Sequence, residues 1–439
     1  MIYLYEILIF PIAVSLFSFN QFSLFDLLGV RSEVQILVVP LTLIISFVMI
    51  LPRTRRLLRD PLFVYLAVML IIYSIKNIEI TESYNLMFSM LVAGVIITAP
   101  KRFHEKLAKL IIGIVFLFSL MGILQAIILM FNPALTKDLA VFSGAYLNSK
   151  ENLFFADSSY GIPEYPEFRF LGLGDGGGGQ FGPFYFSRLR SFLHEPSLVV
   201  AYFALPGALS LTFGGHWKKI GIIILIFTCL TGASSAFVLV PIALFSYIIL
   251  RIKNVKYALF FPFVGGLIFY TATYYFVPAF NPLEISSYTE YWSDTGSFIG
   301  SGDDKMVSYI TRLGLISNAV GAYFQNPIFG VGVDLHSPLG LFAWSAVYGG
   351  ALGCLVVFLL FSNLFKMLIQ VFKHAYTESL FKAIPYVLIY AIFIEAAWFN
   401  DYGFSVGFGL TMIALTYRRL QEITSQYSMN TVNHNGQER

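Results

Sequence analysis

The fold is decided by a long run without a charged residue, residues 220–250, whose sequence is IGIIILIFTCLTGASSAFVLVPIALFSYIIL. A membrane-spanning helix needs roughly 20 apolar residues, so this run is too long for one helix. The segment TGASSA, which begins at Thr231, interrupts the run with small and polar residues that are typical of a tight turn. The stretch therefore predicts two short membrane helices joined by a turn.

The same apolar character extends over the whole chain. Of its 439 residues, 57% are hydrophobic, 17% are aromatic and only 12% are charged, and the mean hydropathy is +0.74. This composition predicts an all-α integral membrane protein, a single polytopic domain over residues 1–439 with about 12 transmembrane helices. The net charge of +3 gives no reason to expect nucleic acid as a partner. The expected spans are centred near residues 10, 43, 69, 92, 120, 205, 226, 243, 267, 351, 389 and 410.

Basic residues alternate between the two sides of this expected topology. The largest cluster is RTRRLLR at residues 53–59, and smaller clusters follow at every second loop as far as residues 418–419. Lys and Arg are retained in short cytoplasmic loops, so both termini are expected in the cytoplasm. The first span has no basic region before it and no small-residue cleavage site, which predicts an uncleaved anchor.

Two long segments, residues 132–197 and 277–339, break the hydrophobic pattern and fall on the outer face in this topology. Loops of this length are usually functional or disordered. The first contains a glycine run, residues 172–182, which predicts a flexible hinge because it lacks the Lys-Ser/Thr ending of a phosphate-binding loop. The second is expected to contain an amphipathic surface helix that begins near Ser301 and ends at Asn326-Pro327.

Ionisable residues gather in the first loop where it meets the membrane. Arg188, Arg190, His194 and Glu195 immediately precede a charge-free apolar segment that begins at Leu198. Ionisable groups packed against a membrane span cost free energy, so this cluster indicates a working site.

Four further residues are expected on the outer face of the membrane, the same side as this cluster. Arg312, on the expected amphipathic helix, is either an interfacial snorkelling arginine or an anion-binding one that faces the first loop. His336 stands at the outer mouth of a span with no counter-charge nearby in sequence, and is either structural or part of the same site. Glu395 and Trp398, at the outer end of the eleventh expected span, line the same cavity or cap the helix.

Three motifs of this region together resemble a known superfamily. They are Arg188-x-x-Ser-Phe-x-x-Glu195-Pro-Ser entering a span, Arg312 ahead of Asn-Pro-Ile-Phe-Gly-Val-Gly, and His336-Ser before a glycine-rich span. In this order they are similar to the bacterial polysaccharide polymerases and O-antigen ligases, Wzy and WaaL. The resemblance implies a GT-C-like glycosyltransferase of the bacterial inner membrane that uses undecaprenyl-pyrophosphate-linked oligosaccharides at the periplasmic face. It also implies a flippase and a chain-length regulator as partners.

The chemistry agrees with this resemblance. A pyrophosphate leaving group needs positive charge, and arginine binds phosphate oxygens with two parallel hydrogen bonds, so Arg188, Arg190 and Arg312 are the expected substrate-binding residues. The attacking sugar hydroxyl needs a general base, which His336 or Glu195 can supply. The resemblance assigns this role to His336, and Glu195 then orients the acceptor or holds Arg188. No cofactor or metal is expected, because the outer loops lack clustered carboxylates.

Two other functions compete with a polymerase. One is an O-antigen ligase that transfers glycan to lipid A-core, and the other is a transporter of lipid-linked sugars. Transporters generally use carboxylates or broken helices near the bilayer midplane. The expected spans within residues 198–250, 257–276 and 341–360 carry no charge, which favours an enzyme.

Overall fold

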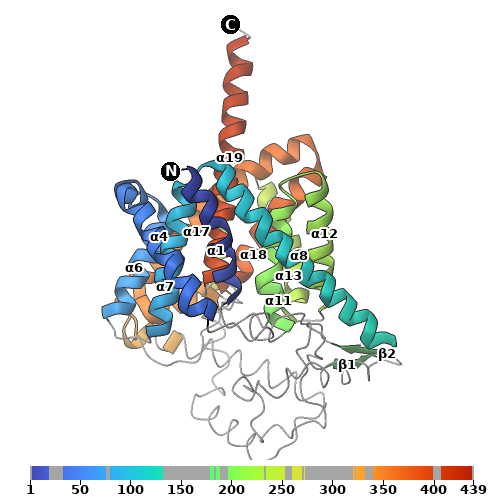
Figure 1. Ribbon diagram of the computed structural model, residues 1–439. Helices are drawn as coiled ribbons and strands as arrows, with labels where there is room; N and C mark the ends of the chain where they lie inside the picture. Colours follow the sequence, from blue (N-terminus) through green and yellow to red (C-terminus); the bar gives the residue numbers. More distant parts are fainter. Residues whose placement is uncertain are drawn as a thin grey trace, which may run out of the picture.

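The computed structural model describes a bundle of apolar helices (Figure 1). The described residues are 2–18, 33–75, 80–131, 178–181, 184–187, 196–231, 234–252, 260–268, 271, 320–321, 323–331, 340–398 and 407–437. The first half of the bundle consists of α1 (Ile2–Ser18), η1 (Val34–Val38), α4 (Val39–Ile50), η2 (Leu51–Arg53), α5 (Thr54–Leu57), α6 (Pro61–Ile75), α7 (Ile80–Thr98) and α8 (Lys101–Phe131). The second half consists of α11 (Pro196–Ser210), α12 (His216–Leu230), α13 (Ser234–Arg251), α17 (Gly340–Glu378), α18 (Leu380–Trp398) and α19 (Gly407–Gln437).

The predicted helical membrane architecture is confirmed in its coarse form. Each of the twelve expected span centres lies in helical residues. Four segments are long and apolar enough to cross a membrane on their own, namely Val34–Leu57, Lys101–Leu124, Gly340–Glu378 and Leu380–Trp398. Five shorter apolar helices accompany them, namely Leu4–Ser18, Pro61–Ile72, Leu86–Thr98, Val199–Ser210 and Val238–Arg251.

The turn predicted inside residues 220–250 is also confirmed. Helix α12 ends at Leu230 and α13 begins at Ser234. Thr231 ends α12 by donating its hydroxyl to the carbonyl of Thr228, at 2.7 Å. Two adjacent short helices therefore replace one overlong span.

One element departs from the all-α prediction. Strand β1 (Gly178–Phe181) pairs antiparallel with β2 (Phe184–Ser187), with Gly178 opposite Ser187 and Phe181 opposite Phe184. Part of the glycine run that was expected to be a flexible hinge is thus a hairpin strand. The aromatic sequence of β2 has high strand propensity and a two-residue connection suits a hairpin, so local pairing outweighs the flexibility of the glycines.

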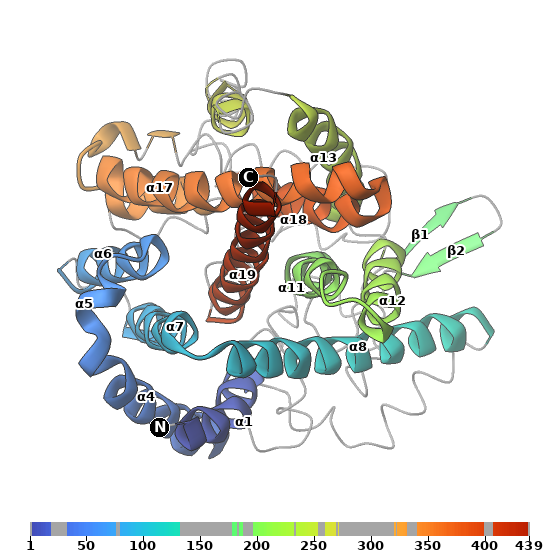
Figure 2. The same cartoon turned by 90° about the horizontal axis from the view of Figure 1, so that it is seen from above.

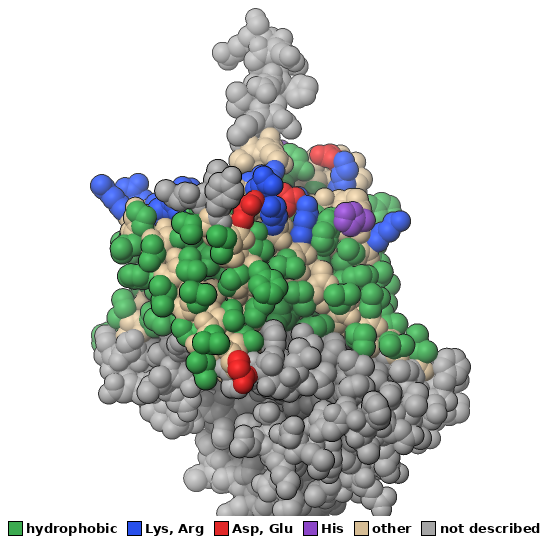
Figure 3. All heavy atoms as spheres, in the orientation of Figure 1, with side chains coloured by type: hydrophobic (Ala, Val, Ile, Leu, Met, Phe, Trp, Pro, Cys, Tyr) green, Lys and Arg blue, Asp and Glu red, His purple; other side chains and the backbone are tan. Residues whose placement is uncertain are grey.

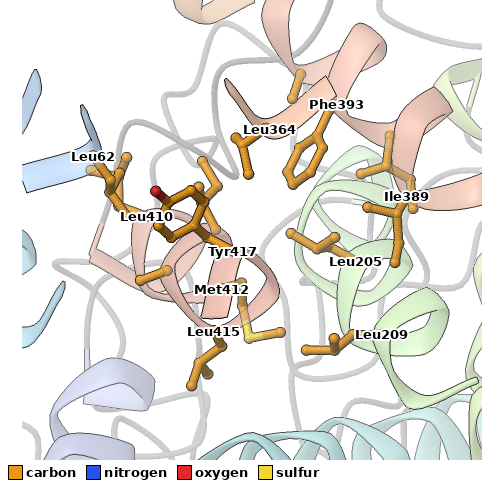
Figure 4. Close-up of a cluster of buried hydrophobic side chains, with 14 of the residues drawn as sticks. Leu62, Leu205, Leu209, Leu364, Ile389, Phe393, Leu410, Met412, Leu415 and Tyr417 are labelled. Carbon is orange, nitrogen blue, oxygen red and sulfur yellow. The ribbon is translucent and has the colours of Figure 1, made fainter. Parts of the chain in front are cut away.

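The core lies where α19 passes through the middle of the bundle (Figure 2). Helices α17 and α18 lie on one side of it, and α8 and α1 lie on the other. In the close-up, Leu205 and Leu209 of α11 lie near Ile389 and Phe393 of α18 and near Met412 of α19 (Figure 4). All five side chains are buried, so α11 packs against both α18 and α19 in the core.

The two ends of the bundle differ in charge. Both termini lie at one end, which we call the termini end (Figure 1). The visible Lys and Arg side chains gather there, and a belt of hydrophobic side chains lies below them (Figure 3). Exposed apolar side chains on α4, such as Ile44 and Val48, belong to this belt. A surface that is apolar in the middle and basic at one end is typical of a membrane-embedded bundle.

Candidate functional site

Two helices that follow predicted site residues in the chain, α11 and α17, begin at the end of the bundle opposite the termini end, which we call the loop end (Figure 1). Arg188, Arg190, Glu195, Arg312 and His336 all lie outside the described residues. The structure does describe the helices that follow two of them in the chain. Glu195 directly precedes α11, and His336 stands four residues before α17. The geometry of the site is therefore built from these helix ends.

Helix α18 is the element that connects the two helix ends. It packs against α17, α13 and α11. Helices α11 and α17 correspond to the sixth and tenth expected spans. Because α18 contacts both of them, it joins the two helices that follow Glu195 and His336 in the chain.

The start of α17 fits tightly against the end of α18. Gly340 has a positive φ of 81°, and a Cβ atom there would lie 2.6 Å from the carbonyl oxygen of Ala397. Two residues later, the ring of Phe342 stacks on that of Trp398, with centroids 4.8 Å apart and an interplanar angle of 8°. The other neighbour of Trp398 is Gly266, where a Cβ atom would lie 2.1 Å from the indole. Only glycine allows these backbones to approach so closely.

Helix α17 is broken at Gly350, which corrects the expectation of one span centred near residue 351. Gly350 has φ 56° and ψ −146°, outside the helical region, and joins a short first arm to a long second arm. Such a conformation is essentially restricted to glycine. The first arm turns back along the second, since a Cβ atom on Gly353 would lie 2.3 Å from the carbonyl oxygen of Ser345.

A loop from far upstream of the break satisfies its backbone groups. The amide of Ala351 donates to the carbonyl of Pro327, and the amide of Val331 donates to the carbonyl of Val347, both at 2.7 Å. A helix end leaves amides and carbonyls without intrahelical partners, and in a membrane such groups must find partners within the protein. The loop that begins at Asn326 therefore packs against the break at Gly349-Gly350 through backbone hydrogen bonds.

Glycines make this docking possible. A Cβ atom on Gly330, which has a φ of 70°, would lie 2.8 Å from the amide nitrogen of Gly350. A Cβ atom on Gly350 would lie 2.5 Å from the amide nitrogen of Gly330. The sequence indicated close backbone approach at these glycines, and the structure identifies each as the partner of the other. The expected end of the amphipathic helix also holds, because residues 323–325 are helical and a turn begins at Asn326.

Sequence reasoning left two roles open for Glu395, namely lining the cavity of the site or capping the helix. It lies in the last turn of α18, inside a candidate membrane span, and is only 2% exposed. The unsatisfied backbone groups at the end of a helix are carbonyls, which a carboxylate cannot cap because it has no proton to donate. The alternative of a helix cap is therefore disfavoured. An ionisable side chain buried in a span is a candidate functional residue.

A pair of hydroxyls holds the first arm of α17 in place. Tyr65 of α6 and Ser345 lie 3.2 Å apart, and both are fully buried. On the same side, Gly349 packs against Met69 and Ile72. Helix α6 therefore contacts the first arm of α17 through Tyr65, Met69 and Ile72, and α18 contacts it through Trp398.

The described part of the loop end contains no ready metal site. Within the residues that the structure describes, no three His, Cys, Asp or Glu side chains are grouped so as to hold a metal ion. Comparisons with family models, with curated proteins and with solved structures find no match to this chain.

Proposed function

We propose that this chain is a membrane-embedded glycosyltransferase that joins undecaprenyl-pyrophosphate-linked oligosaccharide repeat units into O-antigen, capsular or exopolysaccharide. The observation that carries the proposal is the arrangement around α18. The helices that follow Glu195 and His336 both pack on it, and the buried carboxylate of Glu395 lies in its last turn. This end of the bundle is opposite the one where the Lys and Arg side chains of the described residues gather (Figure 3).

Chain geometry keeps the two candidate bases near this arrangement. Glu195 is bonded to Pro196, the first residue of α11. His336 is four residues from Gly340, so its Cα atom lies at most roughly 14 Å from that of Gly340 even in a fully extended chain. The backbone of Gly340 in turn contacts Ala397 and Trp398 of α18. The chain thus tethers both candidate bases to helices that pack on α18.

In the proposed reaction, a hydroxyl of the acceptor sugar attacks the anomeric carbon of the donor. The bond from that carbon to the pyrophosphate oxygen breaks as the new glycosidic bond forms, and the lipid pyrophosphate leaves with the electron pair. His336 accepts the hydroxyl proton, while Arg188, Arg190 and Arg312 neutralise the phosphate charge. Glu195 orients the acceptor or holds Arg188. No metal takes part in this scheme.

The membrane arrangement belongs to the same proposal. About 12 spans in a GT-C-like fold, with both termini in the cytoplasm of a bacterium, would place the loop end at the periplasmic face of the inner membrane. Supporting this, the basic residues and both termini share one end (Figures 1 and 3). A flippase would deliver the substrate to the loop end, and a chain-length regulator would act there too.

The test is polymerisation by the purified protein in detergent, using a lipid-linked repeat unit. We expect a ladder of longer products, unchanged by EDTA. His336→Ala should abolish the ladder, Glu195→Gln should leave measurable activity, and Arg188→Lys or Arg312→Lys should reduce it sharply because lysine lacks the planar fork. A ladder absent from the wild type would refute the proposal. Glu195→Gln inactive with His336→Ala active would transfer the role of base to the carboxylate.

A lipid-linked-sugar transporter is the second candidate, and two observations favour it. Helix α17 is broken at Gly350, and Glu395 is a carboxylate buried inside a span. Both features are frequent in transporters. A transporter would move the lipid-linked unit across a proteoliposome without lengthening it, whereas the polymerase lengthens it in detergent. Adding lipid A-core as acceptor separates the ligase, which would attach a glycan to that acceptor.

A further inference from the structure

The lipid-facing side of α4 leads directly to a group of arginines at the termini end. Leu41, Ile44, Val48 and Leu51 are each more than half exposed and recur at three- or four-residue spacing. This spacing places them in one stripe along the helix, the side that a membrane helix turns towards lipid. The chain beyond the stripe is PRTRRLLR, residues 52–59. The arginines therefore lie where an apolar lipid-facing surface ends.

The short helix α5 and the two residues that follow it hold three of these arginines at the surface. Leu57 is fully buried, and α5 contacts α7, which fixes the segment to the bundle. Arg55, Arg56 and Arg59 are exposed, and Leu58 between them is 58% exposed. Guanidinium groups thus alternate with an apolar side chain on a surface next to the lipid stripe.

Among the described residues, these three arginines have no acidic partner. The nearest acid in sequence, Asp60, is buried and accepts hydrogen bonds from the amides of Leu62 (3.0 Å) and Phe63 (3.4 Å), so it caps α6. The ion pairs of the termini end use other cations, as in the contact of Lys106 with Glu6 at 2.9 Å. Within the described ranges, no carboxylate oxygen lies within 4.0 Å of Arg55, Arg56 or Arg59.

The guanidinium of Arg418 adds positive charge near these arginines. Burial lowers the pKa of Arg418, and the nearby Arg56 adds to this shift, whereas the carboxylates of Glu422 and Asp60 oppose it. The Nε atom of Arg418 is buried without a hydrogen-bond partner. Like charges that lie this close repel each other, and an anion placed among them would relieve the repulsion.

We propose that Arg55, Arg56 and Arg59, together with Leu51 and Leu58, bind the phosphate headgroups of anionic phospholipids in the leaflet at the termini end. The guanidinium fork matches phosphate oxygens, and basic clusters next to a membrane helix attract anionic lipids. The exposed leucines select a lipid over a soluble phosphate, because acyl chains cover the stripe that runs into them.

The test uses the full-length protein in detergent, titrated with phosphatidylglycerol or phosphatidylcholine and followed by native mass spectrometry. The variant Arg55→Gln/Arg59→Gln should lose about tenfold or more in apparent affinity for phosphatidylglycerol, since each basic residue near an anionic surface contributes roughly fivefold. Its matched control is Lys218→Gln/Lys219→Gln, which removes two exposed charges from the start of α12. This control should stay within about twofold of wild type. Arg55→Lys/Arg59→Lys should fall between them.

Three outcomes would overturn the proposal. One is equal binding of the two lipids by the wild type. Another is an equal loss in both glutamine variants, which would indicate attraction by net charge alone. The third is full competition by millimolar glycerol phosphate, which would identify the ligand as a soluble phosphate instead of a lipid. Unchanged melting temperatures of the variants in detergent would show that a loss of binding is not a loss of folding.

Discussion

The two ends of the bundle join distant segments in different ways. At the termini end, polar and charged side chains make the connections. Lys106 of α8 contacts Glu6 of α1, and Arg419 of α19 donates to the carbonyl of Thr212 at 2.8 Å. At the loop end, the backbones of Gly330 and Gly350 are in direct contact, and the stacked rings of Phe342 and Trp398 join α17 to α18.

The difference follows from the surroundings of each end. Charged groups next to water lose little solvation, so ion pairs there cost little to form. Within a membrane, helices associate mainly through close packing, which small residues allow, and through hydrogen bonds between buried groups. The loop end should therefore tolerate added side-chain volume poorly, and the termini end should be sensitive to charge and pH.

The largest effect is expected at the break in α17. Gly350→Ala places a Cβ atom 2.5 Å from the backbone of Ile328 and Gly330 and requires a conformation that costs about 1–3 kcal/mol by itself. We expect a clear fall in the melting temperature in detergent and loss of polymerisation. The control is Gly113→Ala in α8, where a new Cβ atom meets nothing within 4 Å. Equal stability of the two variants would show that the docked loop does not need glycine.

The next effect concerns the buried carboxylate at the loop end. If the proposed glycosyl transfer is correct, Glu395→Gln should reduce polymer yield by at least about tenfold, because an ionisable group is retained in a span for its charge. The exposed Glu378, paired with Lys382, provides the control variant Glu378→Gln. A full product ladder from Glu395→Gln, with only a lower melting temperature, would assign Glu395 a structural role.

A smaller effect is expected from the arginine that joins α19 to the α11–α12 turn. Arg419 donates to the carbonyl of Thr212 at 2.8 Å, and its guanidinium lies 4.7 Å from the centroid of the Phe213 ring. Arg419→Ala should cost about 1.5–3 kcal/mol of stability, as for hydrogen bonds to charged groups. Lys218→Ala, on an exposed side chain of the same end, should change stability little. If Arg419→Ala and Lys218→Ala change stability equally, the contact between Arg419 and the α11–α12 turn does not stabilise the fold.

The smallest effect is a pH dependence at the termini end. Burial raises the pKa of the Glu422 carboxyl above its ordinary value of 4.5, although Arg419 and Lys101 act in the opposite direction. The folded state therefore favours the protonated form. This contribution to stability is complete below pH 4.5 and disappears as the pH rises through the pKa of the folded state.

The variant Glu422→Gln is neutral at every pH and isolates this contribution. The melting temperature of the wild type should fall relative to that of the variant as the pH rises from about 4.5 to 8. Burial also raises the pKa of Asp60, but Asp60 titrates in both proteins and cancels in the difference. Parallel curves for the two proteins would show that Glu422 titrates as it does in the unfolded chain.

Sequence reasoning succeeded where a local pattern carries the information. The turn at Thr231 follows from the length of an apolar run, and the end of a helix at Asn326-Pro327 follows from proline chemistry. It failed where the outcome depends on a partner far along the chain. The tenth span was expected as one segment centred near residue 351, because hydropathy cannot reveal that a loop near Pro327 supplies hydrogen bonds to a break at Gly350.

The candidate site shows the same limit. Its five sequence-predicted residues lie outside the described residues, so their roles stay predictions. The sequence did not predict that α18 contacts both α11 and α17, the helices that follow Glu195 and His336. No periodicity in the sequence encodes which helices are neighbours, because side chains that face lipid and those that face another helix are equally apolar.

The sequence by itself determined that this protein is a helical membrane bundle with clusters of basic residues in every second loop, because hydrophobic length and charge are properties of each segment alone. Only the tertiary structure decided that α17 breaks, that Gly330 and Gly350 lie against each other, and that Glu395 is buried in the last turn of α18. These features depend on close packing between segments far apart in the chain, and such packing is settled only when the whole bundle assembles.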